Sequence, residues 1–166
     1  MSALAIWYSG RLAFNQARAA KREKVQTYVR IIAIASQEAE HAVHLLQGAS
    51  ARSSAAGGDI YGFEALGANL KAIQFHDAPD HRLISIIRDA ADACHMLDTN
   101  CDKIMNTGIA VSRLNLIDAE EGASILLQCF MDAADISIEL LPWHRRVPKR
   151  IWSSLLNTLR GAFKLH

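Results

Sequence analysis

Apolar residues recur along this chain at alternating intervals of three and four positions, the spacing that gathers side chains on one face of an α-helix. The first helix is predicted over about residues 2–47. Its apolar stripe consists of Val25, Tyr28, Ile32, Ala35, Ala39, Ala42 and Leu46. Because this stripe is narrow and rich in alanine, a partner helix can approach it closely. Four of the nine glycines fall at positions 48–62, which predicts a flexible loop over about residues 48–60.

The same pattern predicts further helices over about residues 61–75, 80–106, 118–141 and 148–165. It is most regular in the third helix of the chain, where the stripe is Leu83, Ile87, Ala90, Cys94, Leu97, Cys101 and Ile104. No strand-like alternation competes with it. The prediction is an all-α fold over residues 1–166 as one domain, a four- to five-helix antiparallel bundle with a long N-terminal helix and a basic amphipathic C-terminal helix.

Two helix starts carry capping residues. Asp77 or Asp80 can cap the helix that follows, with Pro79 in its first turn. Asp118 is predicted to cap the next helix, with Glu121 as the partner in a capping box.

Charge is segregated along the chain, although the net charge is only +1. Residues 1–22 hold four Lys or Arg and residues 142–166 hold six, and neither segment contains an acid. Residues 23–141 hold all seventeen acids against eight bases. The basic ends could therefore pack on the acidic middle, where one helix carries an acidic stripe over residues 118–139. The alternatives are that they bind an anionic membrane surface or a nucleic acid.

The C-terminal segment is the predicted contact surface. The run HRRVPKR at residues 144–150 places four positive charges in seven residues between two tryptophans. The residues predicted to bind are Arg145, Arg146, Lys149, Arg150, Trp152 and Arg160. We therefore expect a non-enzymatic adaptor, inhibitor or assembly subunit that binds a partner protein. Nucleic-acid or peripheral membrane binding, the latter through Trp152, Leu156 and Phe163, and homo-oligomerisation are the alternatives.

A metal site between helices is a second hypothesis. Glu38-x-x-His41 has the spacing that di-iron helical proteins use, and Asp92-x-x-His95 repeats it with a shorter acid. An acid and an imidazole one turn apart can face a metal. However, the positions of His41 and Glu38 fall on the polar side of the predicted helix, so we expect no metal and no other cofactor.

A third hypothesis is catalytic. Arg88 and His95 lie two helical turns apart with Asp92 between them, and this Arg-x6-His spacing resembles the motif of HEPN-type helical ribonucleases. The resemblance covers eight residues. It implies a metal-independent ribonuclease in which Arg88 and His95 act together on the scissile phosphate. A cluster of Arg88, Asp92 and His95 could hold a phosphate and shuttle a proton. Binding without catalysis is the main expectation.

Three cysteines, an odd number without a CxxC pair, all fall in helical apolar pattern. They are expected to be small core residues of a protein in a reducing compartment, which places the chain in the cytoplasm.

Overall fold

The computed structural model describes residues 3–51, 62–73, 78–107 and 113–141, and every regular element in these ranges is a helix. The helices are α1 (Ala3–Ala51), α2 (Phe63–Lys71), α3 (Arg82–Thr107) and α4 (Arg113–Glu139). The predictions of an all-helical chain and of a long N-terminal helix are confirmed. None of the described helices is long and apolar enough to cross a membrane.

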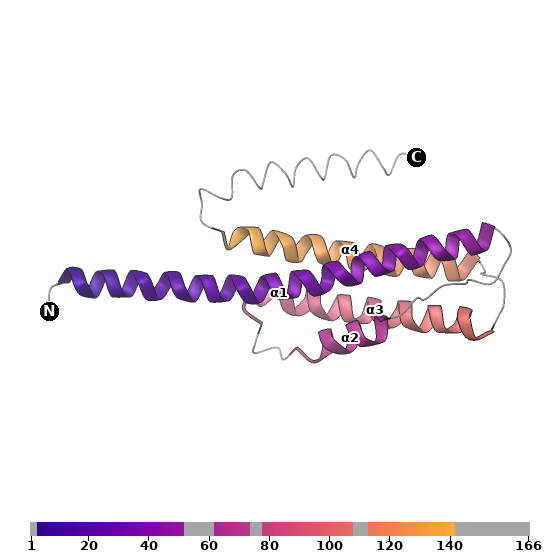
Figure 1. The fold of residues 1–166 in the computed structure, drawn as a ribbon, viewed down its shortest axis with the longest axis horizontal. Coiled ribbons are helices and arrows are strands. Elements are labelled where there is room, and N and C mark those ends of the chain that lie inside the picture. Colours follow the sequence, from indigo (N-terminus) through magenta and orange to yellow (C-terminus); the bar gives the residue numbers. More distant parts are fainter. Residues whose placement is uncertain (1–2, 52–61, 74–77, 108–112, 142–166) are drawn as a thin grey trace, which may run out of the picture.

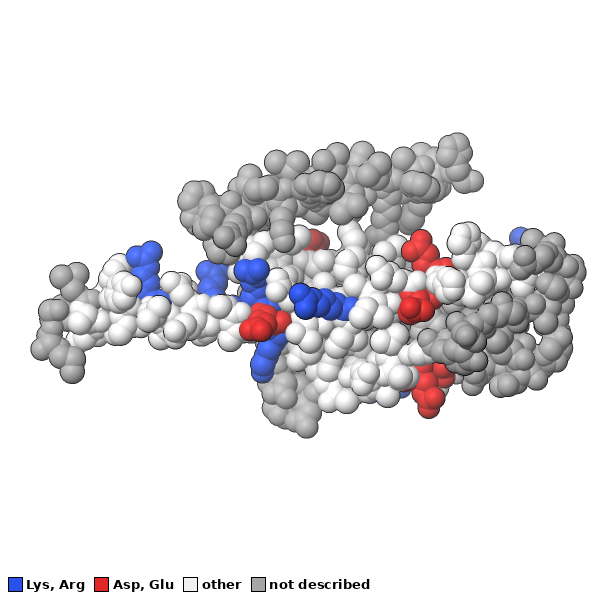
Figure 2. Space-filling view, in the orientation of Figure 1, with Lys and Arg blue, Asp and Glu red and all other residues white. Residues whose placement is uncertain are grey.

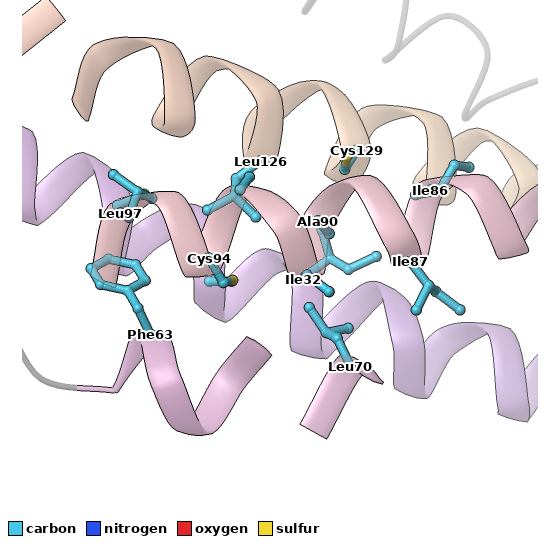
Figure 3. Close-up of a cluster of buried hydrophobic side chains, with 14 of the residues drawn as sticks. Ile32, Phe63, Leu70, Ile86, Ile87, Ala90, Cys94, Leu97, Leu126 and Cys129 are labelled. Atoms are coloured by element: carbon cyan, nitrogen blue, oxygen red, sulfur yellow. The ribbon is translucent and has the colours of Figure 1, made fainter. Parts of the chain in front are cut away.

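Three long helices lie side by side, and the short α2 lies on one of them (Figure 1). α4 packs along the C-terminal part of α1, α3 packs along α4, and α2 packs on α3. The predicted stripes of α1 and α3 lie in the core of this arrangement, together with residues of α4. Ile32 of α1, Leu97 of α3 and Leu126 of α4 are fully buried. Figure 3 shows Phe63 and Leu70 of α2 reaching toward α3, which closes the core on that side.

Two glycines allow the helices to approach one another closely. A Cβ atom at Gly122 of α4 would lie 2.9 Å from Cγ of Leu97 on α3. A Cβ atom at Gly67 of α2 would lie 3.3 Å from Cβ of Cys94 on α3. Both glycines therefore act as packing residues, and neither has the positive φ that only glycine tolerates readily.

Helix boundaries differ from the predictions in three places. The helix predicted over about residues 61–75 ends at Lys71. α1 continues through Gly48 to Ala51, so the predicted loop is wrong for residues 48–51. The reason is that Ala49 extends the buried stripe and is only 1% exposed. Likewise α4 begins at Arg113, so Asp118 lies inside the helix and does not cap it. No glycine or proline interrupts residues 113–118, and Leu116 packs against the core.

The start of α3 agrees with the prediction. The backbone N–H of Arg82 donates to a side-chain oxygen of Asp80 over 3.1 Å, so Asp80 is the capping residue. Pro79 precedes the cap rather than occupying the first turn. Asp77, residues 52–60 of the predicted loop and the predicted C-terminal helix lie outside the described residues.

Candidate binding surface

The N-terminal part of α1 is longer than anything that packs beside it. α1 has 49 residues, whereas α3 has 26 and α4 has 27. At about 1.5 Å per residue, α1 is roughly 73 Å long and its neighbours roughly 40 Å. Residues 3–20 of α1, here called the projecting end, consequently lie largely beyond α3 and α4 (Figure 1), and the last turn of this range shares a hollow with Leu140. Every residue from 5 to 20 is exposed.

Large apolar side chains cover this exposed helix. Five of them are at least 49% exposed: Ile6, Trp7, Tyr8, Leu12 and Phe14. A run of this size without cover is unusual for the surface of a protein, and such surfaces commonly bind a partner. Positively charged side chains accompany them, and Figure 2 shows Lys and Arg spaced along this part of the molecule. No acid occurs in residues 1–22.

The aromatic and basic side chains are paired on the helix surface. The guanidinium carbon of Arg11 lies 5.2 Å from the centroid of the Trp7 ring. That of Arg18 lies 6.0 Å from the centroid of the Phe14 ring. Each pair is separated by four residues, so both rings and both cations share one stripe of the helix. This stripe is able to contact apolar and negatively charged groups together.

The stripe of the projecting end continues the buried stripe of α1 in the same register. The positions Trp7, Arg11, Phe14, Arg18, Lys21, Val25, Tyr28 and Ile32 alternate in steps of four and three. Val25 and Ile32 are fully buried against neighbouring helices, whereas Trp7 is 60% exposed and Phe14 is 62% exposed. A continuous 3-4 spacing is the signature of packing against another helix. The projecting end thus carries a helix-packing stripe without a helix on it in the part of the chain that the structure describes.

A polar network fixes α1 to the rest of the fold just after the projecting end. Nζ of Lys21 lies 3.9 Å from Oδ2 of Asp80, at the start of α3. Arg82 donates to Asp80 over 3.2 Å and to Oε2 of Glu139, at the end of α4, over 2.7 Å. The hydrogen bonds that Arg82 donates to Asp80 hold the pKa of that carboxyl below its usual range. These contacts therefore bring α1, α3 and α4 together where the projecting end begins.

The residues of the metal hypothesis are exposed on two helices. Glu38 and His41 lie on α1, and Asp92 and His95 lie on α3. Within residues 3–51, 62–73, 78–107 and 113–141, no three His, Cys, Asp or Glu side chains gather as a metal site requires. The structure therefore does not bring these four residues together as one group.

The residues of the ribonuclease hypothesis share α3. Arg88, Asp92 and His95 are all exposed. Arg88 and Asp92 line a hollow of about 340 Å³ together with Lys71 of α2, and His95 is not among the described residues that line it. The hollow could hold a small anion beside Arg88 and Lys71. The proposed general acid–base group, His95, stands apart from it.

The three cysteines are buried, which confirms their prediction as core residues. Burial raises the pKa of the Cys94 thiol to about 11, and the nearby charge of Asp98 adds to the effect. Burial likewise raises the pKa of Cys129 to about 11, with the charges of Asp89 and Asp132 adding to it. These thiols are protonated at neutral pH, so they are poor nucleophiles.

Comparison of the chain with known protein families, with curated proteins and with solved structures found no match. The residues predicted to bind, Arg145, Arg146, Lys149, Arg150, Trp152 and Arg160, lie outside the described residues.

The contact surface predicted from the sequence lies in the C-terminal segment, and the prediction did not include Trp7 and Phe14. Two signals pointed to them. The predicted helix over residues 2–47 is much longer than the helices predicted to cover it, and its 3-4 spacing continues backward from Val25 through aromatic and basic positions.

Proposed function

We propose that this chain is a non-enzymatic macromolecule-binding protein, an adaptor, inhibitor or assembly subunit, and that the projecting end of α1 is a contact surface. The observation that carries the proposal is the row of exposed apolar side chains, including Trp7 and Phe14, on a helix that is longer than the helices packed beside it. Leaving this apolar area in water is unfavourable, at roughly 25 cal/mol per Å². A partner that covers it would recover that free energy.

The proposal includes an antiparallel helical bundle for the whole chain, with the basic C-terminal segment as a second contact surface. The packing of α1 on α4 and of α3 on α4 supports the bundle. The charge segregation supports the second surface, because residues 142–166 contain six Lys or Arg and no acid.

The test compares three forms of the full chain. They are the wild type, a variant with Trp7→Ser, Arg11→Glu and Arg18→Glu, and a control with Arg30→Glu and Arg113→Glu. The control reverses two exposed charges away from the projecting end. Each form is tested against vesicles with about a third of anionic lipid, labelled single-stranded RNA and an extract of the cells that make the protein. Self-association is followed by light scattering.

We expect the wild type and the control to bind in at least one of these four assays, and the triple variant to lose that binding. The proposal is wrong if the triple variant keeps every interaction of the wild type, or if the wild type binds nothing. None of the three substituted positions is buried, so the triple variant should keep its helical fold. Circular dichroism checks this.

The ribonuclease hypothesis keeps one structural observation in its favour, the hollow beside Arg88, Asp92 and Lys71. It predicts that pure protein cleaves RNA without added metal and that His95→Ala abolishes the cleavage. RNA that stays intact with the wild type would exclude it. A macromolecule-binding protein should instead tolerate His95→Ala.

A further inference from the structure

A groove between α3 and α4 is lined by apolar and acidic residues, which complement the apolar and basic residues of the projecting end. It encloses about 470 Å³, and its apolar lining includes Ile86, Met96 and Ile125. Three carboxylates, those of Asp89, Asp92 and Asp132, line it as well. Of the described residues that line the groove, none is a lysine or arginine. The groove therefore offers apolar contacts and negative charge at the same place.

We propose that the projecting end of one molecule docks in the α3–α4 groove of a second copy of this chain. The proposal rests on the proposed function above and names the partner of that surface. In it, the rings of Trp7 and Phe14 cover the apolar part of the groove. Arg11 and Arg18 meet the carboxylates of Asp89, Asp92 and Asp132.

The two surfaces agree in charge. The projecting end belongs to a segment with four Lys or Arg and no acid. The acids of the groove already act on their surroundings, because the charges of Asp89 and Asp132 help to raise the pKa of Cys129 between them. A guanidinium pair brought to the groove would therefore be attracted by several carboxylates at once.

The two surfaces also agree in length and in form. The rise along the helix from Trp7 to Arg18, eleven steps, is roughly 17 Å, and the rise from Ile86 to Met96, ten steps, is roughly 15 Å. The projecting end carries the 3-4 stripe that packs against helices, and a groove between two helices is the form that accepts such a stripe.

A projecting end that docks in this groove has to come from another molecule. α1 is one helix from Ala3 to Ala51, and its C-terminal part is packed on α4. The projecting end points away from the fold (Figure 1), so it cannot turn back into the groove of its own chain without breaking the helix. Exchange in both directions closes a dimer, whereas exchange in one direction extends a chain of molecules.

Two other partners fit the projecting end less well. In a helix that lies on a membrane, the charged side chains stand opposite the apolar ones, whereas Arg11 and Arg18 here share a stripe with Trp7 and Phe14. A nucleic acid would be repelled by residues 23–141, which hold seventeen acids against eight bases.

The experiment measures the mass of the full chain by light scattering as its concentration rises. The wild type should exceed the monomer mass of 18.3 kDa. The variant with Arg11→Glu and Arg18→Glu, and separately the variant with Asp89→Lys and Asp132→Lys, should each associate more weakly by about a hundredfold or more, because like charges then face each other. The chain with all four changes should associate again, because its charges are complementary once more. The control with Arg30→Glu and Arg113→Glu should behave as the wild type.

Cysteine trapping tests the same contact without depending on charge reversal. Chains with Ala17→Cys and chains with Gln128→Cys are mixed under mild oxidation. Since the native cysteines are buried, the two added thiols are the reactive ones among the described residues. A disulfide-linked pair of chains should form, and it should not form when Arg30→Cys replaces Ala17→Cys.

A wild type that stays monomeric, or groove variants that associate as the wild type does, would overturn the proposal. The proposed function is judged separately. Binding of the wild type to vesicles, RNA or a cellular protein that is lost with Trp7→Ser, Arg11→Glu and Arg18→Glu would retain the projecting end as a contact surface while rejecting the second copy as its partner.

Discussion

The two parts of α1, residues 5–20 and residues 21–51, have the same 3-4 spacing but differ in burial. Residues 21–51 bury a stripe that is rich in alanine against the neighbouring helices, with Ile32 and Ala39 fully buried. Residues 5–20 are exposed throughout, although Trp7 and Phe14 occupy the equivalent positions of the stripe. The comparison shows that a 3-4 spacing predicts a face suited to helix packing, but does not determine whether a helix of the same chain covers that face.

The residue types on the two parts of the stripe differ in a way that fits this difference in burial. Alanine at positions 35, 39 and 42 allows a neighbouring helix to approach closely and leaves little room for adjustment. Trp7 and Phe14 offer large flat areas, and Arg11 and Arg18 offer charge that water can solvate while the surface is uncovered. The first part is suited to burial within the fold, whereas the second combines large apolar side chains with cations that water hydrates.

The largest expected effect contrasts equivalent positions of the two parts. Ile32→Ala should lower the free energy of unfolding by about 2–5 kcal/mol, because it leaves a cavity in the core. Phe14→Ala should change it by less than about 0.5 kcal/mol, because the ring is exposed. Urea unfolding of dilute protein, followed by circular dichroism, measures both. Similar losses would show that the projecting end is covered within the monomer.

Alanine at two glycines should give effects of opposite sign. Gly122→Ala should cost about 1–3 kcal/mol, because the new Cβ would lie 2.9 Å from the side chain of Leu97. Gly10→Ala meets no atom within 4 Å and should stabilise the helix by up to about 1 kcal/mol. Thermal unfolding distinguishes the two. A destabilising Gly10→Ala would place another segment against the projecting end.

The junction between the two parts should respond to pH. The pKa of Asp80 is lower in the folded chain than its ordinary value of 3.8, so its contribution to stability is full above that value and is lost as the pH falls through the folded pKa. Asp80→Asn should cost about 1 kcal/mol at neutral pH, because the amide can still cap α3 but loses the ion pairs with Arg82 and Lys21. The difference between wild type and variant should shrink below about pH 4. A constant difference at all pH values would exclude the charge of Asp80 as the cause.

The smallest expected effect lies in the projecting end itself. Arg11→Gln should loosen the helix near Trp7 by about 0.5 kcal/mol, because it removes the cation from the face of the ring. Amide hydrogen exchange of residues 5–20 measures this opening. Arg30→Gln, at an exposed position of the packed part, is the control. Equal exchange in wild type and Arg11→Gln would show that the pair contributes nothing to local stability.

The start of α3 could be predicted from the sequence because local chemistry sets it. Asp80 caps α3 as predicted, because its carboxylate satisfies a backbone N–H that has no partner within the helix. Other ends depended on packing. Gly48 would ordinarily weaken a helix, and α1 continues past it because Ala49 is buried. Asp118 has the composition of a cap, but the preceding turn packs Leu116 against the core and starts α4 earlier.

By itself, the sequence determined that the chain is helical, which faces of two helices are buried and that the cysteines are core residues, because all of these follow from the period of the apolar positions. It also determined that charge is segregated. Only the tertiary structure decided where each stripe meets a partner. Trp7 and Ile32 obey the same spacing, and their burial differs because α3 and α4 end before the N-terminal part of α1 does. The acidic groove between α3 and α4 likewise exists only when Asp89 and Asp132, on separate helices, are brought together.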